Sequence, residues 1–312
     1  MFLGVSFCPQ RLSQCETNEL EAPPHATASP HPLPSCSPAP PGTAPTHAPQ
    51  AIRALGMSAL PLPPSIAHMG EEEDTMRDMA LSWIAQDVDL SIHMGMITLC
   101  LDTASRAAHQ AITTFDGRTL QLLAFRVFNS MAASLRLTTH GYFQSAGMVW
   151  RDLYETGWLV SYLHTYPEKI AIWSHEKDRK IRKEFEPHNI RKALNARDKF
   201  AHDHRSKIYW DLCGHASHPS FAGLYLLGPP GQDPNCGAFM EMAALSRTLE
   251  GLVEACTICA ANVSALVDLA DDESSSALGR FYIATNEWNA SFHGVPFPEE
   301  RRDEIRKAFG VE

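Results

Sequence analysis

Residues 242–266 read MAALSRTLEGLVEACTICAANVSAL, and this stretch decides the fold. Its apolar seam repeats at alternating spacings of three and four and comprises Met242, Leu245, Leu249, Leu252, Cys256, Cys259, Val263 and Leu266. Arg247, Glu250 and Glu254 fall on other faces. A seam of this kind is typical of a helix that packs along its neighbours at a shallow angle. It predicts a long helix over about residues 238–269 in an antiparallel helical bundle.

The remaining chain beyond residue 70 shows the same helical periodicity. The pattern predicts further helices, long or short, over residues 71–112 (one helix or two), 119–137, 142–166, 167–186, 188–217, 278–288 and 299–309. Only residues 221–227, between Pro219 and Gly228, favour a short strand. We therefore predict an all-α protein, with a helical-bundle domain over residues 73–270 and a C-terminal helical extension over residues 271–312.

The first 68 residues have a different composition. Fourteen of the 22 prolines fall within residues 1–66, together with only five charged side chains. Proline removes backbone donors and restricts its neighbours to extended conformations, so we expect a disordered Pro-rich tail rather than a ligand for a Pro-binding groove. An alternative is that translation begins at Met57, Met69 or Met76 and that the native protein lacks this tail.

Charge and cysteine usage restrict the function classes. The net charge of −10 argues against nonspecific nucleic-acid binding by the whole molecule. The eight cysteines have no regular spacing, which excludes a disulfide framework and favours a reducing compartment. No signal sequence and no run of 18 apolar residues is found, so we expect a cytoplasmic protein without a membrane span. Cys256 and Cys259 lie on the apolar seam, which favours core packing over a metal or cofactor site.

One charged pair lies in the most apolar helix. Arg151 and Glu155 are four residues apart and share a helical stripe with Trp158 and Tyr162. One interpretation is a salt bridge that fixes helix register, since a buried charge needs a partner. The other is a polar site floor that receives an anionic or aromatic ligand.

Residues 176–207 concentrate the basic side chains. Eleven Lys or Arg and six Asp or Glu give this segment a net charge of +5 in an acidic protein. Such a segment favours a local anion site, for example for RNA or a nucleotide. The alternative is a solvated helix face with paired charges.

Histidines follow and overlap the basic segment, at His188, His202, His204, His215 and His218. Their spacing does not match a closed zinc site, although His202, His204, His215 and His218 could supply four ligands. Acid–base chemistry is the second interpretation. Arg197 precedes His202 by five residues, and an imidazole can transfer a proton while a guanidinium stabilises a phosphorane. This pairing suits metal-independent cleavage of RNA.

Several motifs occur in an order that resembles a prokaryotic family of all-helical domains of unknown function. They are Arg151-x-Leu153-x-Glu155, then Pro167-Glu168, then Tyr209-Trp210-Asp211-Leu212-Cys213, and His218-Pro219-Ser220. The chain departs from that family at Cys213, where the family tends to have serine. Such domains are similar to HEPN helical bundles, several of which are dimeric ribonucleases with an R-x4–6-H motif. The resemblance implies a HEPN-like bundle, a candidate ribonuclease activity and a homodimer.

These observations define the expected site and function. Arg197 with His202, or Arg151 with His218, would stabilise charge and transfer the proton. Glu155, Trp158, Tyr209 and His215 would bind the ligand. We thus expect an RNA- or nucleotide-directed HEPN-like module without a cofactor. The alternative is a non-catalytic protein-interaction domain.

Overall fold

The computed structural model describes residues 64–174, 183–200, 203–217, 220, 222–229 and 233–311. The predicted tail up to residue 63, His202 and His218 lie outside these residues. Every regular element among the described residues is helical, so the all-α prediction is confirmed. The strand predicted at residues 221–227 is wrong, because residues Ala222–Leu226 form a 3-10 turn (η2). Gly223 donates its N–H to the carbonyl and the hydroxyl oxygen of Ser220, and this turn replaces the extended backbone.

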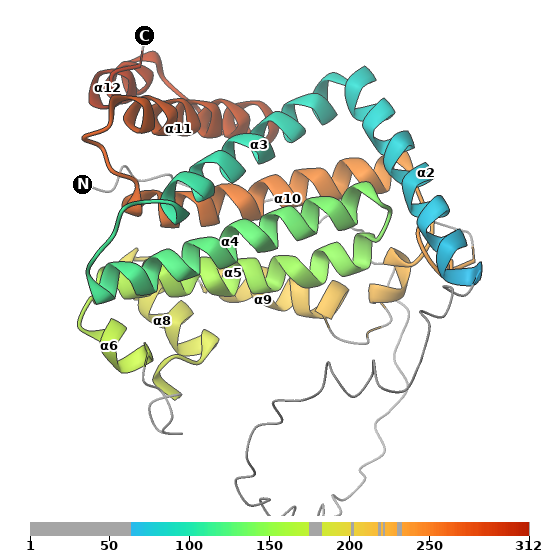
Figure 1. The fold of residues 1–312 in the computed structure, drawn as a ribbon, viewed down its shortest axis with the longest axis horizontal. Coiled ribbons are helices and arrows are strands. Elements are labelled where there is room, and N and C mark those ends of the chain that lie inside the picture. The colour runs from blue at the N-terminus through green and yellow to red at the C-terminus, as the bar shows by residue number, and fades with distance from the viewer. Residues whose placement is uncertain are drawn as a thin grey trace, which may run out of the picture. The chain divides into compact units, whose positions relative to one another are not determined.

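Four long helices form the bundle (Figure 1). They are α3 (Val88–Ala108), α4 (Phe115–Thr139), α5 (Phe143–Thr165) and α10 (Met242–Val263). The short connections after α3 and α4 reverse the chain, so α3, α4 and α5 alternate in direction. A long connection follows α5, and α10 returns parallel to it. Trp150 therefore meets Gly251, and Gly157 meets Cys259 further along.

Helix α10 contacts α3, α4 and α5 and forms the centre of the core. The seam from Leu245 to Val263 is buried, as predicted, whereas Met242 is exposed. The helix begins later than predicted because the Glu241 carboxylate caps it and accepts the N–H groups of Ala243 and Ala244. The prediction of an apolar seam is confirmed over the central turns.

Length and composition alone would allow one helical stretch, Met242–Leu266, to cross a membrane. The pair formed by His68–Gln86 and Val88–Ala108 also passes this test as one broken span. In the bundle, however, 56% of the window in Met242–Leu266 is buried against other helices. A core helix has this property, and the absence of a membrane span stays a prediction.

At the N-terminal side of the bundle, α2 (Pro64–Gln86) is bent by 107° from α3. The predicted segment 71–112 is therefore two helices. Asp87 sits at the bend and accepts the N–H groups of Asp89 and Leu90, which caps α3. This local cap explains why the apolar pattern does not continue as one straight helix.

The long connection between α5 and α10 consists of short helices. They are α6 (Lys169–Ser174), α8 (Pro187–Arg197), α9 (His204–Leu212), the π-helical turn η1 (Cys213–Ser217) and η2. Pro187 begins α8, where its missing N–H has no helical partner to lose. Helices α8 and α9 and the turn η1 all contact α5. This packing brings the basic segment onto the helix that carries Arg151 and Glu155.

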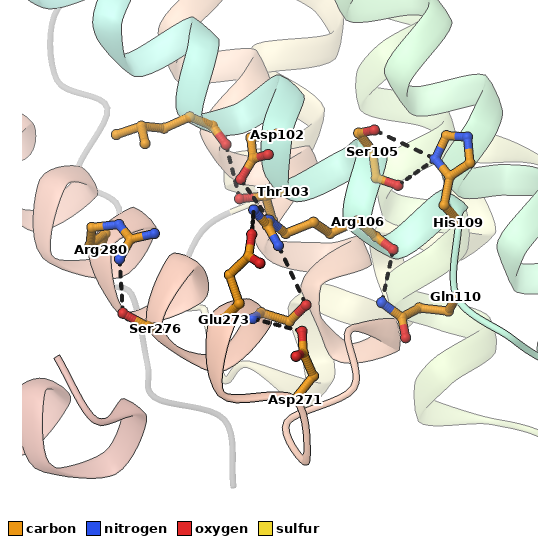
Figure 2. Close-up of polar contacts among 12 residues, drawn as sticks. Asp102, Thr103, Ser105, Arg106, His109, Gln110, Asp271, Glu273, Ser276 and Arg280 are labelled. Atoms are coloured by element: carbon orange, nitrogen blue, oxygen red, sulfur yellow. Dashed lines mark hydrogen bonds and ion pairs between the residues drawn. The ribbon is translucent and has the colours of Figure 1, made fainter.

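The C-terminal extension packs on the bundle through α11 (Asp272–His293), which is followed by α12 (Glu299–Phe309). Figure 2 shows the polar contacts at one end of the α3–α11 interface. Arg106 on α3 bonds Asp102 at 2.8 Å and Glu273 at 3.1 Å, while Asp271 caps α11. At the other end, Trp288 donates to the buried His93 ring at 3.0 Å. The extension is thus joined to the core at both ends of α11.

Candidate anion-binding site

Four of the predicted site residues converge where α9 crosses α5. Arg151 donates from Nη2 to the Tyr209 hydroxyl at 2.9 Å and from Nε to Glu155 at 3.0 Å. The Arg151 guanidinium carbon also lies 5.1 Å from the centre of the Tyr209 ring. The Arg151 side chain is 31% exposed, so this pair lies on the rim of the cluster. The predicted salt bridge exists, and it also connects α5 to α9 through Tyr209.

A fifth residue, Arg191 on α8, lies beneath this rim. Its guanidinium carbon is 3.9 Å from the centre of the Tyr209 ring and 5.9 Å from that of Trp158. The residue is only 3% exposed. Tyr209 therefore contacts two arginines, one on the rim and one in the interior. We call Arg151, Glu155, Trp158, Arg191 and Tyr209 the arginine cluster.

The polar atoms of Arg191 are only partly satisfied. Nε donates to the Ser206 hydroxyl at 3.3 Å, whereas Nη1 is buried without a hydrogen-bond partner. Among the described residues, no carboxylate lies within ion-pair distance of this guanidinium. Burial lowers the pKa of Arg191, and the nearby Tyr209, Asp203 and Glu155 oppose that shift. An arginine nevertheless keeps its proton at any physiological pH.

The charges of the cluster do not cancel. Arg151 and Arg191 are cationic and Glu155 pairs with Arg151, so these three side chains carry a net charge of +1, part of which the nearby Asp203 offsets at Arg191. Asp203 also caps α9, where it accepts from the Ser206 N–H at 3.3 Å and from Asn195 at 2.5 Å. A hydrogen bond from the Ser206 hydroxyl, together with these two bonds and the nearby Arg191, outweighs burial and lowers the pKa of Asp203. Two planar guanidinium groups with a surplus positive charge suit a phosphate or a carboxylate.

Tyr209 holds the two cations in place as a neutral phenol. Burial, followed by a hydrogen bond with the Cys213 thiol, raises the pKa of Tyr209. Its ring faces can therefore stabilise the adjacent guanidinium groups. Cys213 is buried, and its thiol lies beside Tyr209.

Arg197, the other predicted arginine, lies at the end of α8 and is engaged by protein groups. It bonds both oxygens of Asp198, at 2.7 and 3.0 Å. Its Nη1 donates to Ser161 at 3.1 Å and to Thr165 at 2.7 Å, both on α5. Arg205 also bonds Asp198. This network attaches α8 to α5, and its predicted histidine partner, His202, lies outside the described residues.

Of the other two predicted site histidines, the structure describes only His215, and no contact with the arginine cluster is found for it. His215 is exposed in η1 and its Nδ1 lies 2.8 Å from the Asp211 carbonyl oxygen. His218 lies outside the described residues, so its pairing with Arg151 stays a prediction. His204, one of the four histidines considered above as possible zinc ligands, has a buried Nε2 without a hydrogen-bond partner. Burial and the neighbouring Arg205 and Lys207 lower its pKa.

Metal ligands are not gathered anywhere in the described part of the chain. No group of three His, Cys, Asp or Glu side chains there could hold a metal ion. Cys256 and Cys259 are fully buried, as the core-packing interpretation predicts. The Cys259 thiol donates to the Leu153 carbonyl at 3.2 Å, and burial raises its pKa.

Two further features lie elsewhere on the bundle. Glu254 on α10 is buried 3.4 Å from His293, and burial, with a smaller contribution from Glu250, raises the pKa of Glu254 to about 7. An open groove of about 670 Å³ runs between α4 and α5, with Leu122, Met148 and the Arg126–Asp152 pair among its lining residues. Neither feature shares a residue with the arginine cluster.

Sequence reasoning missed Arg191 because it is one of eleven basic residues in its segment. A signal exists in the spacing, since Ile190, Arg191 and Leu194 lie on the buried side of α8. An arginine on the apolar side of a short helix marks a charge that the fold must accommodate.

Comparisons with protein-family models, with curated proteins and with solved structures find no match to this chain.

Proposed function

We propose that this protein is an RNA- or nucleotide-directed, HEPN-like helical module that binds a phosphate group at the arginine cluster. The observation that carries the proposal is the state of Arg191. Its guanidinium is 3% exposed, is stacked on Tyr209 and has a buried Nη1 without a partner. A buried polar group of this kind is uncommon in folded proteins and points to a ligand.

The energetics favour an anion as that ligand. A charge removed from water costs several kcal/mol unless it is paired and hydrogen-bonded. The faces of Tyr209 and Trp158 offset part of this cost, by about 0.5–2 kcal/mol per cation–π contact. A phosphate oxygen would accept the remaining Nη1 donor and neutralise the surplus charge. Arg151, on the exposed rim, supplies the second guanidinium and the entrance.

RNA cleavage is the stronger form of this proposal. In it, Arg197 and His202 stabilise the phosphorane and transfer the proton without a metal ion, and Arg151 with His218 is the alternative pair. The chain would then act in the cytoplasm, which agrees with the free thiols of its described cysteines. Cleavage that persists in EDTA and is lost in His202→Ala would support this form. If the wild-type protein cleaves no RNA, the cleavage form of the proposal fails and only the binding form remains.

The binding test compares two arginine-to-methionine variants. Arg191→Met removes the buried cation, whereas the control Arg280→Met removes an exposed one on α11. We expect Arg191→Met to weaken binding of inorganic phosphate and of single-stranded RNA by roughly 10- to 100-fold, since hydrogen bonds to charged groups contribute about 1.5–3 kcal/mol. Arg280→Met should bind as wild type does. Equal affinities of wild type and a folded Arg191→Met protein would refute the proposal.

A second candidate function is protein interaction, and the α4–α5 groove favours it. Leu122 and Met148 are exposed there beside the Arg126–Asp152 pair. A second copy of this chain, related by a two-fold axis, could bury these two apolar side chains and exchange the Arg126–Asp152 pair between the copies. Sedimentation equilibrium at micromolar concentration would detect this homodimer, and a monomer at all concentrations would exclude it.

A further inference from the structure

Trp210 is the only one of the six tryptophans that is exposed to solvent. It lies on α9 with 63% of its surface accessible. Isolated apolar side chains on a surface are ordinary, but an exposed indole beside a charged cluster suits recognition of a flat ligand. The position of this ring is therefore informative.

The indole adjoins the arginine cluster through Tyr209. The two rings lie 5.3 Å apart, centre to centre, in an edge-on arrangement. The guanidinium of Arg191 lies 3.9 Å from the centre of the same Tyr209 ring. The Tyr209 ring thus neighbours both the exposed indole and the buried cation. Lys207, one helical turn before Trp210 on the exposed side of α9, adds a further positive charge.

A phosphate group alone would not use the indole, whereas a nucleotide combines a phosphate with a flat aromatic base. Stacking on an aromatic side chain is available to any unpaired base, but a duplex already stacks its bases internally. The combination of the arginine cluster, an adjoining open ring and Lys207 fits a chain of nucleotides with exposed bases. A purely apolar protein partner would not require the buried cation.

We propose that Trp210 stacks against an unpaired base of single-stranded RNA whose phosphate occupies the arginine cluster. This inference rests on the proposed function and names the form of its ligand. Lys207 then neutralises a neighbouring phosphate of the same strand. Base identity is read weakly at such a platform because every base has a π face.

The test uses Trp210→Ala, Trp210→Phe and a control, Met148→Ala, which removes another exposed apolar side chain at the α4–α5 groove. Affinity for a fluorescent single-stranded RNA is measured by anisotropy, and inorganic phosphate and AMP by competition. We expect Trp210→Ala to weaken RNA and AMP binding roughly 10-fold, because stacking contributes about 1–3 kcal/mol per base. Phosphate affinity should change less than about two-fold, and Trp210→Phe should retain most of the RNA affinity.

The outcomes separate this inference from the proposed function. If wild type binds neither phosphate nor RNA, the proposed function fails. If Arg191→Met weakens RNA binding and Trp210→Ala does not, only the stacking inference fails. Equal affinity for duplex and single-stranded RNA would also overturn it, since a duplex offers no free base. If binding of the RNA strand depends on Trp210 and binding of AMP does not, the ligand is RNA rather than a free nucleotide.

Discussion

Two buried ionisable side chains, in different parts of the molecule, respond in different ways to the unfavourable free energy of removing a charge from water. Glu254 on α10 is 13% exposed and lies 3.4 Å from His293. Its pKa is raised to about 7, so the carboxyl can take a proton and become neutral near physiological pH. Arg191 on α8 is buried more deeply and cannot lose its proton. The carboxyl can become neutral in its surroundings, whereas the guanidinium stays charged, and we propose that an anion from solution pairs with it.

The surroundings of the two groups reinforce this difference. Glu254 lies near Tyr154 and near the aromatic pair of Trp288 and His293. Burial also raises the pKa of Tyr154. Arg191 lies beneath Arg151 and Tyr209, and the Arg151 side chain above it is 31% exposed. A buried carboxyl can be neutralised by protonation, whereas a buried guanidinium stays charged and is available to an anionic ligand. This difference is why we place ligand binding at α8 and α9 and not at α10.

Glu254→Gln should give the largest change in stability and should depend strongly on pH. Because the folded-state pKa is raised above the unfolded value of 4.5 to about 7, the folded state binds the proton more tightly. The contribution of Glu254 to the stability of the folded state is fully present below pH 4.5 and is lost as the pH rises through 7. Gln, which is neutral at all pH values, should therefore stabilise the protein by up to about 3 kcal/mol above pH 8 and by almost nothing below pH 4.5.

Urea unfolding at pH values from 4.5 to 9 measures this effect, with Glu250→Gln as the control on the same helix. Because Glu250 contributes less than burial does to the raised pKa of Glu254, this variant should show a smaller pH dependence of the same sign. His293 is the group that could reverse the result, because a protonated imidazole would pair with the carboxylate. If Glu254→Gln destabilises the protein between pH 6 and 7, Glu254 and His293 form an ion pair. Glu254 would then be a charged group with a charged partner and would no longer contrast with Arg191 in the way described.

Arg191→Met should have a smaller effect that does not depend on pH. Replacing a buried, incompletely paired charge with an apolar side chain of similar volume is often neutral or stabilising. We expect about 1 kcal/mol of added stability without ligand, constant between pH 5 and 9, because the arginine does not titrate there. Thermal unfolding with and without phosphate provides the measurement. Added phosphate should raise the melting temperature of wild type and not that of the variant.

The sequence predicts the packing of the core more completely than it predicts the arginine cluster. The alternating seam from Leu245 to Val263 predicts the bundle because helical packing is periodic, and periodicity is visible in one chain. The stripe of Arg151, Glu155 and Trp158 predicts three of the five residues of the arginine cluster for the same reason. Arg191 and Tyr209 reach the cluster only through the crossing of α8 and α9 over α5, which no local spacing encodes. The short segment 222–226 shows the opposite limit, because β-favouring side chains there form a 3-10 turn.

Arg151→Met should have the smallest effect on stability and a larger one on binding. The Arg151–Glu155 pair is partly exposed, and such helical pairs contribute about 0.3–0.5 kcal/mol. The bond to Tyr209 adds a similar amount, so we expect a loss of about 1 kcal/mol or less. Phosphate affinity should fall roughly 10-fold, since a rim guanidinium is removed. A double-mutant cycle with Glu155→Gln separates the roles: a purely structural bridge would lower the melting temperature and leave binding intact, because the ion pair would then be the only function of Arg151.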